Sequence, residues 1–255
     1  AGDQFGYAVA SLGDINGDGR PDLGIGAPGA AFDAGLVRVI RGGSAPAQTL
    51  FTLHGRFAED AFGSAIAGAG RTRGVVFSDF VVGAPFNSDF DLWAGKAYLY
   101  FGGAVPDTVP DRAWSGTDAG EFLGQCVAGA GDVNGDGRAD ILIGSPGANA
   151  GATLDAGAAA LYLGAPAPPL SPAVTITGST PLGELGLCVA GVGDLNGDGL
   201  ADFAVGIPGA PDAFVAGAVQ VFYGRAIPIA SPDTVLTGEN LDDMFGKSIA
   251  GGRLR

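Results

Sequence analysis

Three stretches of the sequence place oxygen-bearing side chains at alternate positions of a glycine-rich turn. Each follows the pattern Asp-x-Asn-Gly-Asp-Gly-x-x-Asp, at residues 14–22, 132–140 and 194–202. Calcium takes about six to eight oxygen ligands, and ligands at every second position can wrap a tight turn around the ion. The two glycines allow the backbone to turn that sharply. The pattern therefore predicts three calcium sites built from oxygen ligands alone.

The ligands are predicted to have the same roles in each loop. The first, third and fifth positions supply side-chain oxygens, the seventh a backbone carbonyl, and the ninth a closing carboxylate. The predicted set is Asp14, Asn16, Asp18, Arg20 and Asp22; Asp132, Asn134, Asp136, Arg138 and Asp140; and Asp194, Asn196, Asp198, Leu200 and Asp202. Arg20, Arg138 and Leu200 act through the backbone only. A turn that binds no metal is the alternative, but it does not explain why every ligand position recurs three times.

An EF-hand loop begins in a similar way but has different requirements. It needs an acidic ligand at its twelfth position and a helix on each side. The twelfth position here is Ile25, Ile143 or Val205, inside a predicted strand. The EF-hand is therefore excluded, and a β-hairpin loop closed at its ninth position remains.

The loops recur because the chain consists of repeats of similar length. Each repeat opens with an apolar residue followed by glycine, and successive openings are 57, 61, 62 and 60 residues apart, at Phe5, Phe62, Leu123, Leu185 and Phe245. From this opening to the glycine of a Gly-x-Pro sequence the step is always 21 residues, to Gly26, Gly83, Gly144 and Gly206. Nearly all variation in length falls in the loop that follows. A fixed period of this kind indicates a repeat architecture.

Each repeat contains four short segments, apolar or β-branched, bounded by Gly, Pro and Asp. In the first repeat they are residues 7–12, 22–26, 36–40 and 49–53, and no stretch of ten or more residues has a helical period. The 47 glycines and 16 prolines make a turn-rich chain, while 47% hydrophobic residues suffice for a core. We therefore predict an all-β β-propeller of four-stranded antiparallel blades. A linear β-solenoid is the alternative, although its repeats are usually shorter.

The order of these motifs, Phe-Gly, then the acidic loop, then Gly-Ala-Pro, resembles the FG-GAP repeat of the integrin α-subunit β-propeller and its bacterial relatives. The resemblance covers the whole chain, as four repeats at approximately 1–57, 58–117, 118–179 and 180–238 and the start of a fifth at 239–255. The family propeller is seven-bladed, so residues 1–255 are expected to form a single partial propeller within a larger polypeptide. The fifth repeat stops before its loop would be complete, so no site is predicted there.

The second repeat departs from the ligand pattern. Counting from Phe62 places Arg71, Arg73 and Val75 at the first, third and fifth positions, and only Asp79 remains at the ninth. We predict that this loop binds no calcium. Because its length is unchanged, a guanidinium from Arg71 or Arg73 could neutralise Asp79 where the ion would otherwise lie. Two solvated arginines are the alternative.

The charge of the chain narrows the class of partner. The formal net charge is −14, and nine of the 27 acidic residues lie in the three loops, so bound calcium would offset part of it. This acidity argues against nucleic acid or an anionic membrane surface as a partner. No apolar run reaches the ~18 residues of a membrane span, and no signal peptide is visible. Calcium sites of this kind fill at extracellular calcium levels, and the family is typically secreted or on the cell surface, so we expect that setting here.

The motifs of common enzymes are absent. The single histidine, His54, lies at the end of a predicted strand beside Gly55. There is no Gly-x-Ser-x-Gly turn, no histidine cluster for zinc and no phosphate-binding Gly-x-x-x-x-Gly-Lys loop. A pair of carboxylates facing a cleft, as in glycosidases, stays open at this stage, but the paired acids are already explained as calcium ligands. We therefore expect no catalysis in this segment.

The loop of variable length is the candidate for recognition. In an up-and-down meander it lies at the end of the blade opposite the calcium loop, and in integrin-like propellers that face binds ligand. The richest such loop spans residues 86–93, and exposed aromatic residues often anchor partners. The predicted ligand-binding residues are Phe86, Asp89, Phe90, Asp91 and Trp93. The alternative is that they cover the edge of a neighbouring blade.

Two functions therefore compete. The first is a calcium-stabilised extracellular module for adhesion or ligand binding, with an unidentified protein or glycan as its partner. The second is a propeller domain accessory to a secreted hydrolase, phospholipase-like or glycan-active, because FG-GAP repeats also accompany catalytic regions.

The two cysteines occupy equivalent places in neighbouring repeats. Cys126 and Cys188 each lie three residues after the repeat opening, where Ala8, Ala65 and Ser248 stand elsewhere. We expect small, buried strand residues. A disulfide requires their Cα atoms to lie within about 7 Å and stays open at this stage, so the cysteines do not identify the compartment.

Overall fold

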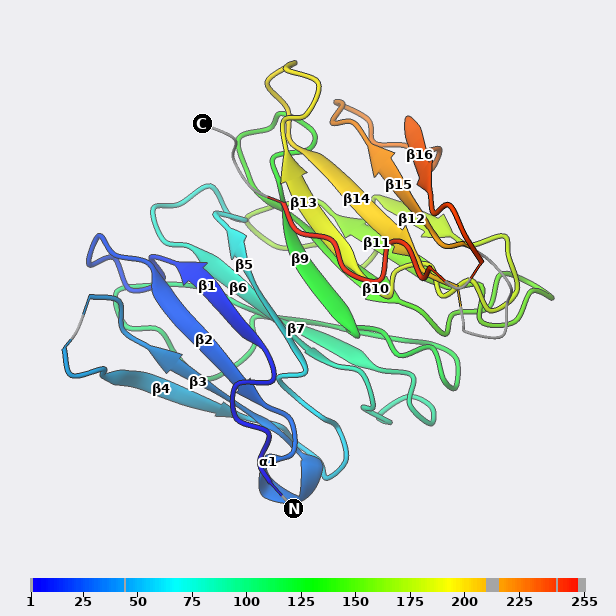
Figure 1. The fold of residues 1–255 in the computed structure, drawn as a ribbon. Coiled ribbons are helices and arrows are strands. Elements are labelled where there is room, and N and C mark those ends of the chain that lie inside the picture. Colours follow the sequence, from blue (N-terminus) through cyan, green and yellow to red (C-terminus); the bar gives the residue numbers. More distant parts are fainter. Residues whose placement is uncertain (1, 44, 210–215, 242, 252–255) are drawn as a thin grey trace.

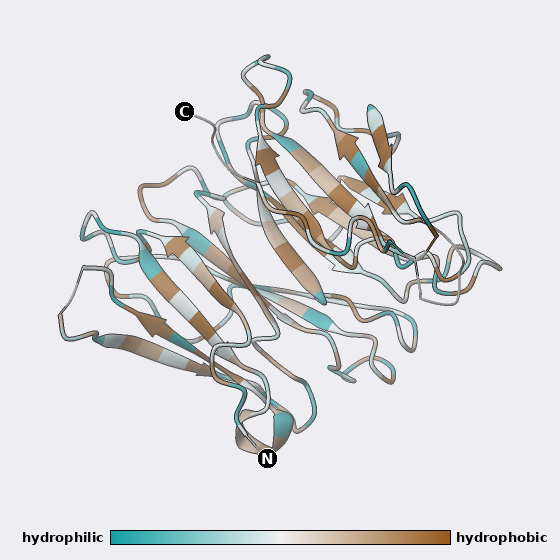
Figure 2. Ribbon diagram, in the orientation of Figure 1, coloured by the Kyte–Doolittle hydropathy of each residue, from teal (hydrophilic) through white to brown (hydrophobic). Residues whose placement is uncertain are grey.

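The computed structural model describes residues 2–43, 45–209, 216–241 and 243–251, and it confirms the all-β architecture. Four antiparallel sheets, each of four strands in sequence order, form propeller-like blades (Figure 1). The first strands of successive blades contact one another, β1 with β5, β5 with β9, and β9 with β13. Apolar residues follow the strands, and polar residues gather in the connections (Figure 2).

Each blade comes from one repeat. Blade 1 contains β1 (Val9–Gly13), β2 (Asp22–Ala27), β3 (Leu36–Ile40) and β4 (Thr49–His54), and blade 2 contains β5 (Ala65–Gly70), β6 (Asp79–Ala84), β7 (Lys96–Tyr100) and β8 (Arg112–Ser115). Blade 3 contains β9 (Cys126–Gly131), β10 (Asp140–Ser145), β11 (Ala158–Tyr162) and β12 (Val174–Thr177), and blade 4 contains β13 (Val189–Gly193), β14 (Asp202–Ile207), β15 (Ala218–Phe222) and β16 (Thr234–Thr237).

Two details differ from the predicted strands. The first strand begins at Val9 rather than at residue 7, because Tyr7 closes a turn by donating its backbone N–H to the Gln4 carbonyl at 3.0 Å. The connection after β2 contains a single helical turn, α1 (Ala30–Asp33), in which Ala31 and Phe32 have left-handed backbone angles. Neither difference changes the order of the strands.

A bulge places the acidic loop at the end of the first strand. In every blade the pairing between strands 1 and 2 skips one residue just before a glycine with positive φ: Gly13, Gly70, Gly131 or Gly193. This glycine pairs with the ninth residue of the loop and directly precedes the first. A bulge bends the strand and redirects the residues that follow, so all four loops leave the sheet in the same way.

The two halves of the repeat motif meet across each blade boundary. Gly63 donates its N–H to the Gly83 carbonyl of its own blade at 2.9 Å. On its other side it touches Gly26 of the preceding blade so closely that a Cβ on Gly26 would lie 2.1 Å from the Gly63 carbonyl oxygen. The corresponding distances are 2.0, 1.9 and 2.1 Å at Gly83 with Gly124, Gly144 with Gly186, and Gly206 with Gly246. No side chain fits at these contacts.

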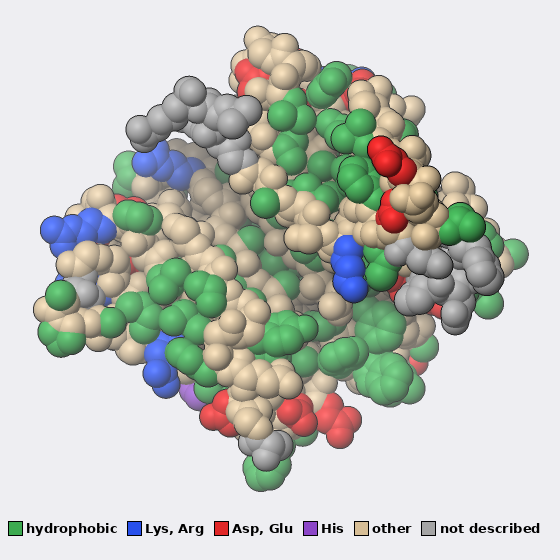
Figure 3. Space-filling view, in the orientation of Figure 1, with side chains coloured by type: hydrophobic (Ala, Val, Ile, Leu, Met, Phe, Trp, Pro, Cys, Tyr) green, Lys and Arg blue, Asp and Glu red, His purple; other side chains and the backbone are tan. Residues whose placement is uncertain are grey.

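The hydrophobic core lies between blades rather than inside one. Val37 and Leu53 of blade 1 pack with Phe62 and Phe80 of the second repeat, and similar clusters join blades 2 and 3 and blades 3 and 4. Among the described residues, no further blade packs on the face of blade 1 that points away from blade 2, and Val9 is 59% exposed there. Hydrophobic side chains are visible over β1 and β2 in Figure 3.

Candidate functional site

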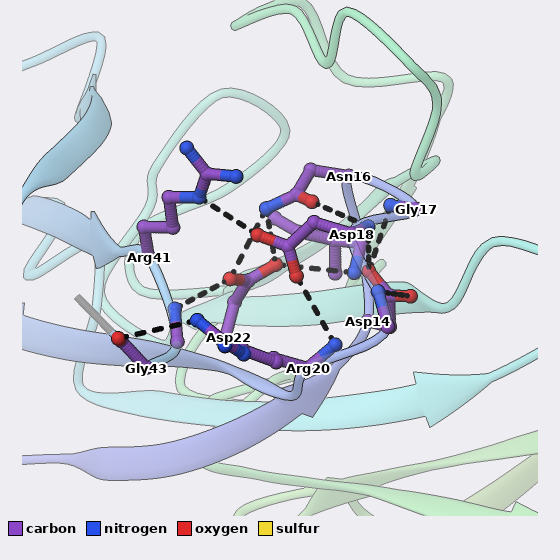
Figure 4. Close-up of polar contacts among 11 residues, drawn as sticks. Asp14, Asn16, Gly17, Asp18, Arg20, Asp22, Arg41 and Gly43 are labelled. Carbon is purple, nitrogen blue, oxygen red and sulfur yellow. Dashed lines mark hydrogen bonds and ion pairs between the residues drawn. The ribbon is translucent and has the colours of Figure 1, made fainter.

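The first acidic loop is wound by hydrogen bonds between its own backbone and side chains (Figure 4). The carboxylate of Asp14 accepts three backbone N–H groups, at 2.7, 3.1 and 2.8 Å. Asn16 Oδ1 accepts the Asp18 N–H at 2.9 Å, and Asp18 Oδ1 accepts the Arg20 N–H at 3.1 Å. The same five bonds recur in the loops at 132–140 and 194–202. The spacing of the pattern therefore fixes the conformation of the loop.

The ninth residue of each loop has a further role. Asp22 is 1% exposed, and its two carboxylate oxygens accept the backbone N–H groups of Ile15 at 3.2 Å and Gly42 at 2.8 Å. The equivalent donors are Thr72 and Gly102 for Asp79, Val133 and Gly164 for Asp140, and Leu195 and Gly224 for Asp202. The carboxylate thus ties the loop to the turn between strands 3 and 4 in all four blades.

This second contact could have been found from a constant step in the sequence. The donor glycine lies seven residues after the glycine that opens the third strand in every repeat, at Gly42, Gly102, Gly164 and Gly224. The step is as invariant as those that define the repeat. The missing information was which residue this glycine contacts.

The loop of blade 2 contains its own cation. Arg73 Nη2 lies 3.1 Å from Asp79 Oδ1 and donates to the Gly102 carbonyl oxygen at 2.8 Å. Its guanidinium carbon lies 3.9 Å from the centre of the Phe101 ring. The prediction that an arginine neutralises Asp79 is therefore confirmed for Arg73, and the alternative of two solvated arginines is wrong.

Thr72 completes the surroundings of Asp79. Its hydroxyl donates to Asp79 Oδ2 at 2.6 Å, and its side chain is buried. The other loops have Ile15, Val133 and Leu195 at this position, which supply only the backbone N–H. The second repeat therefore replaces the oxygen ligands by two side-chain donors of its own.

In the loops of blades 1 and 3 the buried ninth carboxylate lies near further carboxylates. Burial raises the pKa of Asp140 to about 6, and repulsion from Asp136 and Asp132 adds to this, although two backbone N–H groups act in the opposite direction. Burial also raises the pKa of Asp22. Arg41 contacts this first loop, with its Nε 2.7 Å from Asp18 Oδ2, and the sequence did not indicate that contact.

The donor set of these loops fits a hard cation such as calcium, because carboxylates, amides and carbonyls supply only oxygen. Among the described residues no three His, Cys, Asp or Glu side chains converge as a metal site. In the first loop the Asn16 amide points its nitrogen at the ninth carboxylate, with Nδ2 3.1 Å from Asp22 Oδ2 (Figure 4). Turning that amide would present its oxygen instead, with loss of the bond that Asn16 Oδ1 accepts from the Asp18 N–H.

The loops also join neighbouring blades. The Asp14 carbonyl oxygen accepts the Ser78 N–H of the next loop at 2.9 Å, and the Asp132 carbonyl oxygen accepts the Ala201 N–H at 2.9 Å. Arg71 makes the same contact with Ala139 at 3.2 Å. An ordered loop therefore stabilises the boundary between two blades as well as its own hairpin.

A pocket of about 630 Å³ lies at the other end of the blades, between the first two repeats. Its lining includes the aromatic rings of Tyr7, Phe86 and Trp93 and the carboxylates of Asp33 and Glu59, and none of its lining residues is Lys or Arg. These residues come from the connections between strands 2 and 3 and from the segments that lead into the first strands. The pocket therefore lies at the end where recognition was predicted.

The predicted ligand-binding residues are only partly brought together. Phe86 and Trp93 pack against each other and against Phe122 of the next repeat, yet they remain 41% and 45% exposed. They therefore cover a neighbouring blade and also line the pocket. Asp89 forms an ion pair with Lys96 and lines an adjacent hollow with Phe86 and Trp93. Phe90 and Asp91 line neither cavity. His54 is exposed at the end of β4.

Comparison with known proteins identifies the repeats. A model of the FG-GAP repeat matches residues 5–40 and 189–222, and a model of the FG-GAP-like repeat matches residues 132–205. Integrin alpha-5 of Xenopus laevis is 28% identical over 237 residues, which is 89% of this chain and 21% of that protein. Integrin alpha-V of Gallus gallus is 32% identical over 154 residues, 55% of this chain and 15% of that protein. The chain thus spans about a fifth or less of these relatives.

A solved structure agrees with the fold. Sqt1 of Saccharomyces cerevisiae superposes with a TM-score of 0.53 at 8% identity, over 92% of this chain and 48% of that one. At this identity the likeness concerns the fold alone. No helix in the described part of the chain is long and apolar enough to cross a membrane.

Proposed function

The chain is an integrin-α-like FG-GAP repeat protein, and on that premise we propose that it is a calcium-stabilised ligand-binding module that works outside the cell. One observation carries the calcium part. Blade 2 pairs its buried Asp79 with Arg73, whereas Asp140 in the same place accepts only backbone N–H groups, and the arginine of its loop, Arg138, pairs with Asp136 at 3.5 Å instead. A cation bound among Asp132, Asp136 and Asp140 would supply the charge that Arg73 supplies in blade 2.

Calcium has a structural role in this proposal. The side chains at the first, third, fifth and ninth positions and the carbonyl at the seventh would hold it, and the bound ion offsets repulsion and orders the loop. An ordered loop in turn holds the next blade through the bond from Asp132 to Ala201. Sites of this type fill at the millimolar calcium of the extracellular space, which supports that setting.

Ligand binding is assigned to the opposite end. The support is the pocket, which combines half-exposed Phe86 and Trp93 with the carboxylates of Asp33 and Glu59. Exposed aromatic side chains around a concavity are typical anchors for a partner. The matched relatives named integrin alpha favour a protein ligand, and a glycan is the second ligand class to test.

Calcium binding is tested by stoichiometry. Titration calorimetry of the metal-free chain is expected to give three ions per chain, from the three complete loops. Asp198→Ala should lower the count by one, because it removes the fifth-position ligand of the last loop. Val75→Ala, at the same position of blade 2, is the matched control and should leave the count unchanged. Three ions bound by the Asp198→Ala variant would refute the assignment.

Ligand binding is tested on a glycan array and on a panel of extracellular matrix proteins. Trp93→Ala should weaken any binding by at least about tenfold, because a buried aromatic anchor commonly contributes that much. Val76→Ser changes an exposed apolar residue at the calcium-loop end and should have no effect. Equal losses in both variants, or none in Trp93→Ala, would place recognition elsewhere.

A further inference from the structure

Cys126 and Cys188 lie at the same place in consecutive blades. Cys126 begins β9, and Cys188 directly precedes β13. Cys126 Sγ lies 3.3 Å from the backbone N of Val189 and 3.7 Å from its carbonyl oxygen, and Val189 is the residue after Cys188. The Cys126 thiol thus already reaches across the blade boundary to the peptide that carries the second thiol.

The two backbones are equally close a short distance further along. A Cβ on Gly191 would lie 2.3 Å from the carbonyl oxygen of Gly129, so β9 and β13 touch without side chains between them. Each of these glycines is three residues after its cysteine. Inner strands in direct contact favour the short separation of the two Cα atoms that a disulfide requires.

The same contact recurs at the next boundary without a second thiol. Cys188 Sγ lies 3.1 Å from the backbone N of Ile249, the residue after Ser248. Ser248 therefore occupies the same position next to Cys188 that Cys188 occupies next to Cys126. At the boundary between blades 2 and 3 the corresponding residue of blade 2 is Ala65. Within the described residues, only the boundary between blades 3 and 4 brings two cysteines together.

We propose that Cys126 and Cys188 form a reversible disulfide that joins the inner strands of blades 3 and 4. Both are free thiols in the structure and both are half-buried. The bond would cross the contact between β9 and β13 and fix these two blades to each other covalently.

The two thiols have different reactivities. A hydrogen bond from Cys126 lowers the pKa of Cys188 to about 7, and the same hydrogen bond together with burial raises the pKa of Cys126. Cys188 is therefore the more readily ionised of the two thiols, and thiolates are the nucleophiles of disulfide exchange. This difference between the thiols predicts which one reacts first, while the proposal itself depends on the contact between β9 and β13.

The exchange needs a small disulfide such as oxidised glutathione. The Cys188 thiolate attacks one sulfur of that disulfide and releases one glutathione thiolate, which takes up a proton. Cys126 then loses its proton and attacks Cys188 Sγ of the mixed disulfide, which releases the second glutathione. Two protein thiols are oxidised to one disulfide, and one oxidised glutathione is reduced to two glutathione molecules. Extracellular surroundings favour the oxidised form.

The test is oxidation of the folded, fully reduced chain by oxidised glutathione at pH 7.5. We expect the two free thiols to disappear, the mass of the monomer to fall by about 2 Da, and non-reducing peptide mapping to recover Cys126 linked to Cys188. The thermal midpoint should rise on oxidation, because a link between distant residues restricts the unfolded chain.

Two single variants provide the controls. Cys188→Ser should leave Cys126 as a free thiol that is slow to react, whereas Cys126→Ser should take up one glutathione on Cys188, and neither should gain thermal stability on oxidation. Two free thiols, two glutathione adducts, or a disulfide-linked dimer from the oxidised wild-type chain would each overturn the proposal. None of these results depends on calcium or on a ligand.

Discussion

Blades 2 and 3 bury the same carboxylate in different surroundings. Asp79 and Asp140 are both fully buried, and both accept one N–H from their own loop and one from the turn after the third strand. Beyond these bonds Asp79 has Arg73 and Thr72, while Asp140 has Asp132 and Asp136 nearby. The fold therefore requires the ninth carboxylate, and the first, third and fifth residues decide how its charge is balanced.

This separation explains which residue survives in the second repeat. The second repeat has Arg71, Arg73 and Val75 where the other loops have the predicted calcium ligands, yet its hairpin of β5 and β6 is intact. Asp79 remains because two backbone N–H groups would be buried without a partner in its absence, which costs about 1 to 3 kcal/mol for each group. The ninth residue of the loop is therefore needed for the fold, whereas the first, third and fifth residues are the ones that the calcium proposal concerns.

The largest expected effect is that of calcium withdrawal, which should destabilise the three loops with the complete ligand pattern and leave the loop of blade 2 unchanged. At a calcium concentration a hundredfold above Kd, each site contributes about 2.7 kcal/mol, and three sites about 8 kcal/mol. A chelator should therefore lower the thermal midpoint by about 20 °C. Hydrogen exchange should show that the N–H groups of Val133 and Gly164 lose protection, while those of Thr72 and Gly102 change little. A uniform loss across all four loops would contradict the contrast.

Asp79→Ala should be costly whether or not calcium is present. It leaves the partly buried Arg73 guanidinium without its carboxylate, and breaking a buried ion pair costs about 3 to 5 kcal/mol. Urea unfolding with calcium and with chelator should give the same loss. Asp140→Ala is the matched variant, and its loss should be larger with calcium than without. A calcium-dependent loss in Asp79→Ala would mean that blade 2 binds the ion as well.

Restoring the pattern should give blade 2 a fourth site. The chain with Arg71→Asp, Arg73→Asn, Val75→Asp and Val76→Gly is expected to bind one additional calcium ion in a titration. It should gain about 2.7 kcal/mol at a hundredfold excess over Kd, and it should be less stable than the wild type without calcium because Asp79 has lost its arginine. The same chain without Val75→Asp is the control. No additional ion would show that the loop needs more than its ligands.

Of the predicted effects on stability, that of pH should be the smallest. Because the pKa of Asp140 rises from 3.8 to about 6 on folding, the folded chain binds more protons than the unfolded chain between these values. Without calcium, the contribution of this group to stability therefore falls as pH rises from about 4 to 6. Calcium binds the ionised form, so the gain in thermal midpoint on adding calcium should increase over that window. A gain that stays constant between pH 4.5 and 7 would contradict the burial of an uncompensated carboxylate.

Most of the fold could be predicted because it is periodic. The steps between repeat openings, and the invariant 21 residues to the Gly-x-Pro glycine, predicted four strands in each repeat, and the bounds predicted for the first repeat agree with β1 to β4 within two residues. The start of β1 was placed too early because the apolar residues Tyr7 and Ala8 look like strand, whereas the positive φ of Gly6 and the bond from Tyr7 to Gln4 make a turn. Hydrophobicity does not distinguish these two states.

The candidate sites were predicted less evenly. The loop residues are close in sequence, so their spacing was enough to place them in one turn. The substitution pattern indicated an arginine beside Asp79, but it did not choose between Arg71 and Arg73, and the structure selects Arg73. The contacts of Gly42 with Asp22 and Arg41 with Asp18 join different hairpins, and their distance in sequence hides them. The pocket brings Tyr7 and Glu59 beside Trp93 only because two blades pack together.

The glycine contacts at the blade boundaries bear on how such a chain can grow. Gly63 fits against Gly26 behind it, and Gly83 of the same repeat presents an equal surface to Gly124 ahead of it. Every repeat thus carries both complementary surfaces, so a duplicated repeat would match its neighbours on either side from the moment it arose. The strands and loops of that copy could then diverge independently, as the loop of blade 2 has done, while the glycines at its two boundaries could not.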